Sequence, residues 1–193
     1  RGGGGGGAEP DEGATKDIVR SIAISSDGAY GAACSEYGML AIWDLERAEL
    51  VLRLAAPSVT RVVRFHPQEP RTLLAACDDG MIRVYELSDA LGAAAQEGSP
   101  RGKAAPAMLC TKEIGYHELC IRSMRFSRDG SRFVTGSIDA TARVWRMDSV
   151  SQELCLVGHK DTVLDAEISH NMSLVATAST DKTVRVWSGR GGR

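Results

Sequence analysis

Apolar and polar residues alternate along most of this chain in short runs that turn-forming residues separate. The stretch 158–189 shows this most clearly, with apolar runs over 163–168, 174–178 and 184–187. Alternation with a period of two is typical of half-buried β-strands, and polar breaks rich in Gly, Asp and Asn between such runs indicate tight turns. The sequence therefore predicts an all-β fold of short strands.

The same pattern recurs four times. A strand-closing aromatic residue marks each copy: Trp43, Tyr85, Trp145 and Trp187. Their separations are 42, 60 and 42 residues, and the turn pairs that begin at 27, 69, 129 and 171 keep the same spacing. The long interval exceeds one repeat by 18 residues, which is the length of an Ala/Gly/Pro-rich segment at 88–105. Two markers in phase at four places indicate an internal repeat.

We place the repeats at about 17–54, 60–112 with the loop insertion 88–105, 115–157 and 158–188. The glycine-rich stretch 1–16 is expected to be a disordered tail, and 189–193 a flexible one. The expected strands are 19–24, 30–34, 39–43, 50–54, 60–65, 72–77, 81–85, 107–112, 121–126, 132–135, 141–145, 154–157, 163–168, 174–178 and 184–187. The fourth repeat thus stops after three strands.

The stretch 158–189 resembles a WD repeat, the four-stranded unit of a β-propeller blade. Gly158-His159 stands at its start and Trp187 near its end, and Trp43-Asp44 in the first repeat is the family's namesake dipeptide. The resemblance implies four blades of a β-propeller, each an antiparallel sheet packed on its neighbours. Propellers of this family usually close with seven blades, so we expect a partial ring and a chain that is part of a longer protein.

Composition narrows the classes of partner. The net charge is −2 and the pI is about 6.1, so a broad basic field for nucleic acid is absent. No apolar run approaches the roughly 18 residues of a membrane helix. The five cysteines include no Cys-x-x-Cys pair, which favours reduced thiols in a cytoplasmic or nuclear protein. We expect neither a metal nor a cofactor.

Two sets of residues resemble a catalytic triad by type, with identical spacing in repeats three and four. They are His117, Ser137, Asp139 with Trp145, and His159, Ser179, Asp181 with Trp187. A hydrolase needs one Ser–His–Asp set and an oxyanion hole, so two copies one repeat apart favour architecture over catalysis. In WD repeats such residues form a hydrogen-bond network inside the blade, and the resemblance implies that role here. We predict that the chain is not an enzyme.

The first two repeats depart from this pattern, and we expect their blades to be less rigid. Repeat one has Thr15 and Tyr37 at the His and Asp positions. Repeat two keeps Asp79 but has Ala56, Cys77 and Tyr85 at the other three.

Three arginines, Arg20, Arg61 and Arg122, occupy the same place near the start of the first strand, where repeat four has Leu164. By resemblance, this end of the strand opens on the narrow face of a propeller. The arginines are then candidate partner-binding residues for an acidic or phosphorylated peptide. The alternative is that arginine is merely tolerated at a strand start.

The function that the sequence favours is a non-catalytic scaffold subunit that binds protein partners. One alternative comes from Asp181-x-x-Val-Arg-Val-Trp187-x-x-Arg190, which resembles the Trp-Asp-x-Arg box of cullin-type ubiquitin-ligase substrate receptors. There the final arginine, here Arg190, contacts the ligase's adaptor. A second alternative is a chromatin-associated protein, because repeats three and four also resemble those of bromodomain-and-WD-repeat proteins.

Overall fold

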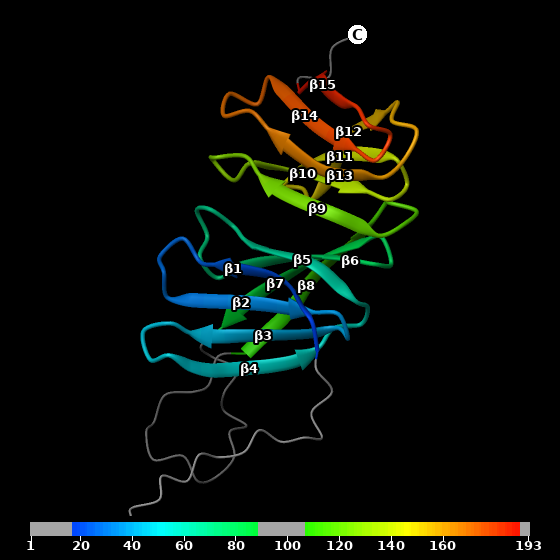
Figure 1. The fold of residues 1–193 in the computed structure, drawn as a ribbon. Helices are drawn as coiled ribbons and strands as arrows, with labels where there is room; N and C mark the ends of the chain where they lie inside the picture. The colour runs from blue at the N-terminus through cyan, green and yellow to red at the C-terminus, as the bar shows by residue number, and fades with distance from the viewer. Residues whose placement is uncertain (1–16, 89–106, 190–193) are drawn as a thin grey trace, which may run out of the picture.

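The computed structural model describes residues 17–88 and 107–189, which form fifteen β-strands and no helix. The strands make four antiparallel sheets, each in simple chain order, which we call blades 1 to 4 (Figure 1). Blade 1 contains β1 (Val19–Ile24), β2 (Tyr30–Ser35), β3 (Met39–Asp44) and β4 (Glu49–Ala55). Blade 2 contains β5 (Thr60–Phe65), β6 (Thr72–Cys77), β7 (Met81–Ser88) and β8 (Ala107–Gly115). Blade 3 contains β9 (Ile121–Phe126), β10 (Arg132–Ser137), β11 (Thr141–Arg146) and β12 (Ser151–Val157), and blade 4 contains β13 (Val163–Ile168), β14 (Leu174–Ser179) and β15 (Val184–Ser188).

The repeat pattern correctly predicted every one of these strands, including the three-stranded fourth blade, and the all-β propeller architecture is confirmed. Several strand boundaries were wrong by two or three residues, including the ends of β8 at Gly115 and of β10 at Ser137, which were predicted at 112 and 135. Ser88 is not part of the insertion but ends β7, where it pairs with Ala107 at the base of a long hairpin. The outer strand β12 begins at Ser151, three residues before the expected start. The predicted tail 1–16, most of the insertion and residues 190–193 lie outside the described residues.

Each innermost strand carries a register shift near its first residue, which marks a β-bulge. The residue inside the shift is Arg20 in β1, Arg61 in β5, Arg122 in β9 and Leu164 in β13. A bulge leaves one residue out of the ladder and re-aims its side chain. The three arginines therefore share a position because each lies at the β-bulge of its innermost strand.

Blades 1 to 4 stack in sequence order, with their innermost strands side by side, so blade 1 and blade 4 lie at opposite ends of the molecule (Figure 1). Between each pair of neighbours lies a layer of buried apolar side chains. Phe65 and Tyr85 fill the layer between blades 1 and 2, Trp145 and Phe133 the next, and Ile168 the last. Since one sheet cannot cover its own faces, the core exists only between blades.

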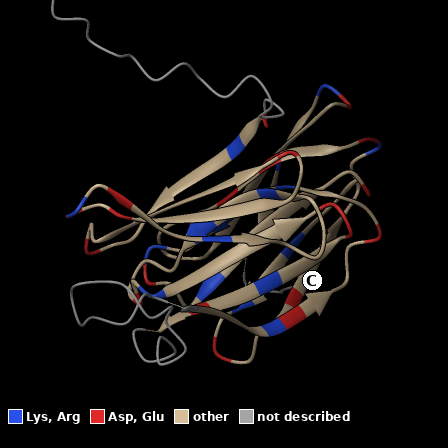
Figure 2. Cartoon of the chain, turned by 90° about the horizontal axis from the view of Figure 1, so that it is seen from below, with Lys and Arg blue, Asp and Glu red and all other residues tan. Residues whose placement is uncertain are grey.

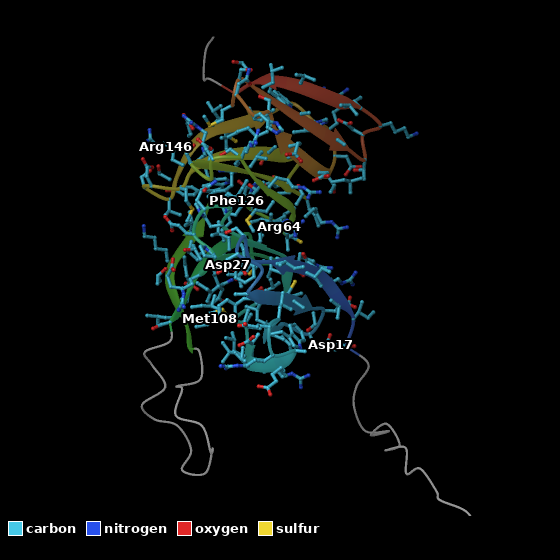
Figure 3. The ribbon with its side chains drawn as sticks, turned by 90° about the vertical axis from the view of Figure 1, so that its left-hand side faces the viewer. Asp17, Asp27, Arg64, Met108, Phe126 and Arg146 are labelled. Atoms are coloured by element: carbon cyan, nitrogen blue, oxygen red, sulfur yellow. The ribbon has the colours of Figure 1, made fainter. Side chains whose placement is uncertain are left out.

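Polar contacts also join the blades. The guanidinium of Arg64, which lies in the middle part of the stack in Figure 3, donates to Ser21 Oγ of blade 1 at 3.1 Å. At the next interface, a Cβ on Gly80 would lie 2.2 Å from the carbonyl oxygen of His117. Gly80 has a φ of +75°, so this tight turn requires glycine for both its conformation and its close approach.

Candidate functional site

A chain of buried hydrogen bonds crosses blade 3 from the loop before β9 to the strand β11. Trp145 Nε1 donates to Thr135 Oγ1 at 2.9 Å, and the same oxygen lies 2.8 Å from His117 Nε2. His117 Nδ1 lies 2.8 Å from Asp139 Oδ2. The side chains of His117 and Asp139 are 0% and 6% exposed. The network therefore ties the loop, β10, the β10–β11 turn and β11 together without access from solvent.

The threonine hydroxyl is the shared partner in this network. An indole N–H can only donate, so Thr135 Oγ1 accepts from Trp145. The same oxygen is hydrogen-bonded to His117 Nε2, and Nδ1 of that ring is hydrogen-bonded to Asp139. Both ring nitrogens of His117 therefore have a partner inside the blade.

The carboxylate of Asp139 accepts several hydrogen bonds besides the one with His117. Its carboxylate also accepts the backbone N–H groups of Glu118 and Thr141 at 3.2 and 2.9 Å, and the Thr141 hydroxyl at 2.6 Å. Burial by itself would raise the pKa of the Asp139 carboxyl, but the hydrogen bonds from His117 and Thr141 outweigh it and hold that pKa well below its ordinary value. The carboxylate is therefore ionised at neutral pH.

Blade 4 repeats this arrangement. His159 Nδ1 lies 2.7 Å from Asp181 Oδ2, and Trp187 Nε1 donates to Thr177 Oγ1 at 2.8 Å. His159 Nε2 lies 2.7 Å from the same threonine oxygen. The agreement between two blades with different surroundings shows that the geometry belongs to the repeat.

The structure places the two predicted serines elsewhere in the blade. Ser137 Oγ donates to the backbone carbonyls of Leu119 and Cys120 at 3.1 and 3.0 Å and accepts the N–H of Asp139. Ser179 donates to the carbonyl of Asp161 in the same way. The hydroxyls that join His to Trp are those of Thr135 and Thr177, two residues earlier, which the sequence interpretation missed.

This geometry differs from that of a nucleophilic triad. In a serine hydrolase the histidine takes the proton of the serine hydroxyl. Here the serine hydroxyls face backbone carbonyls. Each histidine is hydrogen-bonded instead to a threonine hydroxyl, which also accepts the N–H of the tryptophan. His117, Ser137 and His159 are also buried.

Blade 2 has an ion-pair cluster in place of the network. Arg83, whose side chain is 6% exposed, donates to Asp79 at 2.7 Å and to Glu113 at 2.7 Å. It thus links β7 to the β6–β7 turn and to β8. The Tyr85 hydroxyl, at the tryptophan position, is buried without a hydrogen-bond partner among the described residues.

The three bulge arginines differ in their partners. Arg61 makes a two-pronged ion pair with Asp78, at 2.6 and 2.8 Å, and Arg20 is paired with Glu36. Arg122 is exposed and has no ion-pair partner among the described residues, because Ile138 occupies the place of Glu36 and Asp78. The hydrogen bonds of Arg61 chiefly lower the pKa of Asp78, and the charge of nearby Arg122 adds to that effect. Arg20 and Arg61 are therefore ion-paired within their own blades, and Arg122 is the bulge arginine without such a pair among the described residues. Partner binding by the three arginines stays a prediction.

Apolar side chains surround Arg122 at this end of the blades. Leu119, Ile138 and Leu164 are 49%, 39% and 44% exposed. Ile138 N–H donates to the carbonyl of Cys120, which places it next to the start of β9, and Leu164 holds the equivalent bulge of the neighbouring strand. We call these four residues the Arg122 patch. Elsewhere the two signs of charge intermingle over the sheets (Figure 2).

Three remaining points from the sequence concern a membrane helix, a metal site and Arg190. No helix long and apolar enough to cross a bilayer occurs in residues 17–88 and 107–189. The same residues contain no group of three His, Cys, Asp or Glu side chains placed to hold a metal ion. Arg190, the candidate contact to a ligase adaptor, lies outside the described residues.

The fold and these buried networks define the class of protein: a β-propeller of repeated blades, of which blades 3 and 4 share one hydrogen-bond network. The family model described as "WD domain, G-beta repeat" matches residues 11–44, 108–146 and 151–188, which is more than half of the chain. The chain belongs to this WD40-repeat family. The matched regions omit β5, β6 and β7, the part of blade 2 where Arg83 and Tyr85 take the place of the usual network residues.

The chain is similar over parts of three longer relatives. It is 37% identical over 91 residues to THO complex subunit 3 of Arabidopsis thaliana, covering 44% of this chain and 29% of that protein. It is 27% identical over 178 residues to a Ribosome biogenesis protein WDR12 homolog of Caenorhabditis briggsae, covering 91% and 36%. It is 26% identical over 185 residues to Target of rapamycin complex subunit wat1 of Schizosaccharomyces pombe, covering 92% and 52%. The chain thus spans about a third to a half of the length of these relatives, two of which are described as subunits of complexes.

Proposed function

We propose that this protein is a non-catalytic scaffold that binds protein partners through the Arg122 patch, in the cytoplasm or the nucleus. The observation that carries the proposal is the difference between the three bulge arginines. Two of them are neutralised by an acid of their own blade, whereas Arg122 is exposed and faces no such acid among the described residues. A cation held at a fixed bulge and bordered by apolar side chains can bind an anionic group next to an apolar one.

The partner that fits this chemistry is an acidic or phosphorylated peptide segment with an adjacent apolar side chain. Arginine suits such a group because its planar guanidinium can donate two parallel hydrogen bonds to a carboxylate or phosphate. The apolar residues Leu119, Ile138 and Leu164 would cover the neighbouring side chain of the partner. Family membership and relatives that are subunits of complexes support a protein partner. The ubiquitin-ligase and chromatin alternatives stay predictions.

The test compares proteins captured by the wild-type chain with those captured by Arg122→Glu, using quantitative mass spectrometry. Arg20→Ala is the matched control, because Arg20 occupies the same bulge but is already paired with Glu36. We expect a defined subset of partners to be lost with Arg122→Glu and kept with Arg20→Ala. Binding to an array of acidic and phosphorylated peptides should show the same difference. If both variants keep all partners, the Arg122 patch is not the binding surface.

A further inference from the structure

A carboxylate of blade 2 lies beside the Arg122 patch and holds the arginine of the neighbouring bulge. Arg61 donates to both oxygens of Asp78, from Nε at 2.6 Å and from Nη2 at 2.8 Å. The thiol of Cys120, two residues before Arg122, donates to the same carboxylate at 2.8 Å. Asp78 is therefore in contact with the bulge arginine of its own blade and with the strand start that carries Arg122.

The turn that carries Asp78 is packed tightly against the loop of the patch. A Cβ on Gly80 would lie 2.2 Å from the carbonyl oxygen of His117 and 3.3 Å from that of Leu119. The pKa of the Asp78 carboxyl is lowered chiefly by its hydrogen bonds from Arg61, and the charge of Arg122 lowers it further. Asp78 is thus a fixed negative charge within the electrostatic reach of Arg122.

The charges at this place limit what the patch can bind. Arg61 and Arg122 contribute two positive charges and Asp78 one negative charge, and the exposed Glu118 adds a second negative charge on the same loop. The local net charge is therefore no more than +1. A carboxylate brings one negative charge, whereas a phosphate monoester brings about 1.5 to 2 at neutral pH. A carboxylate also matches the planar fork of a single guanidinium.

We propose that Asp78 is a specificity-determining residue that makes the Arg122 patch select a carboxylate over a phosphate. This inference rests on the proposed function and names the class of partner more closely. Asp78 acts without touching the ligand, because it keeps Arg61 occupied and leaves Arg122 to bind alone. A phosphate needs a second cation, and Arg61, which could supply it, is already paired. The ligand is then a peptide with a carboxylate beside an apolar side chain.

The test measures the affinity of short amidated peptides that differ at one position beside a leucine, which holds glutamate, phosphoserine or glutamine. A further glutamine peptide with a free C-terminus separates a chain-end carboxylate from a side-chain one, and binding of either carboxylate supports the proposal. Fluorescence anisotropy at one fixed salt concentration gives the dissociation constants. We expect the wild-type chain to bind a carboxylate peptide at least about 5-fold more tightly than the phosphoserine peptide.

Asp78→Asn should lower this preference by at least about 10-fold, mainly by tightening the phosphoserine peptide, because Arg61 is released to bind with Arg122. A misfolded variant could not produce such a gain. Glu36→Gln is the matched control, since Glu36 is paired with Arg20 in blade 1 as Asp78 is with Arg61, and it should leave the preference unchanged. Adding Arg61→Gln to Asp78→Asn removes the released cation and should restore the preference for carboxylate.

The outcomes separate this inference from the function on which it rests. If no peptide binds the wild-type chain, or if binding survives in Arg122→Glu, the proposed function fails and the inference fails with it. If binding depends on Arg122 but the phosphoserine peptide binds at least as tightly as the glutamate peptide, the proposed function stands and the role of Asp78 is overturned. An unchanged preference in Asp78→Asn would overturn that role in the same way.

Discussion

Replacing Thr135 by valine tests the buried network of blade 3 at the residue that joins its two halves. The change removes one hydroxyl and keeps the shape of the side chain, which is 0% exposed. That hydroxyl accepts from Trp145 Nε1 and is hydrogen-bonded to His117 Nε2. In the variant, the indole N–H and the imidazole Nε2 both lose this partner, and both lie in the buried interior.

The expected cost follows from these two orphaned groups. A buried polar group without a partner costs about 1–3 kcal/mol, which exceeds the net value of an ordinary hydrogen bond. The groups share one site, so the two costs overlap, and we expect the free energy of unfolding to fall by about 2–4 kcal/mol. That is a large part of the roughly 5–15 kcal/mol by which domains are stable.

Urea unfolding followed by circular dichroism measures this loss. Thr180→Val is the matched control, because Thr180 is exposed and its hydroxyl makes a long 3.4 Å bond to the carbonyl of Thr162 and a hydrogen bond to the surface carboxylate of Asp161. The control should change the free energy of unfolding by less than about 0.5 kcal/mol. Hydrogen exchange of the Trp145 indole gives a local readout, which should speed up in Thr135→Val. If Thr135→Val matches the control in both measurements, the network does not hold blade 3 together.

Two further predictions follow from the same region and from the turn of blade 2. Asp139→Asn should destabilise the protein at pH 7, and the difference from wild type should shrink as the pH falls below about 3.8. A depressed carboxyl pKa stabilises the folded state fully above the unfolded pKa, and this contribution is lost progressively as the pH falls toward the folded pKa. Melting temperatures between pH 7 and 3 check this, and parallel curves would contradict it. Gly80→Ala should cost more than Gly28→Ala, about 2–4 against 1–2 kcal/mol, because both have positive φ but only Gly80 meets a neighbouring carbonyl, at 2.2 Å from the new Cβ. Equal losses in urea unfolding would show that backbone conformation alone sets the cost.

The fold could be predicted from the sequence because the period-two pattern and the turn residues repeat in phase. Gly28 and Gly130 do adopt positive φ at the predicted turns. One error falls on the outer strand β12, where that signal is weak: alternate residues of β12 differ little in burial, so the pattern does not show that the strand begins at Ser151. The extension of β7 to Ser88 depends on pairing with Ala107 across an insertion, which local residues do not encode.

Residue type and spacing identified the histidine, aspartate and tryptophan of each network, but not the hydroxyl that joins them. Thr135 and Ser137 are two residues apart on one strand, so alternation places both side chains on the same face and cannot choose between them. What separates them is the register shift between Gly136 and Ser137, opposite Arg122. That bulge turns Ser137 toward the carbonyls of the preceding loop and leaves Thr135 between histidine and tryptophan. The same bulge leaves Arg122 out of the ladder, so one backbone irregularity lies beside both the network of the blade and the residue that we propose binds a partner. Which arginine stays free was visible in the sequence: the residue before the Asp position is acidic in blades 1 and 2, as Glu36 and Asp78, and isoleucine in blade 3.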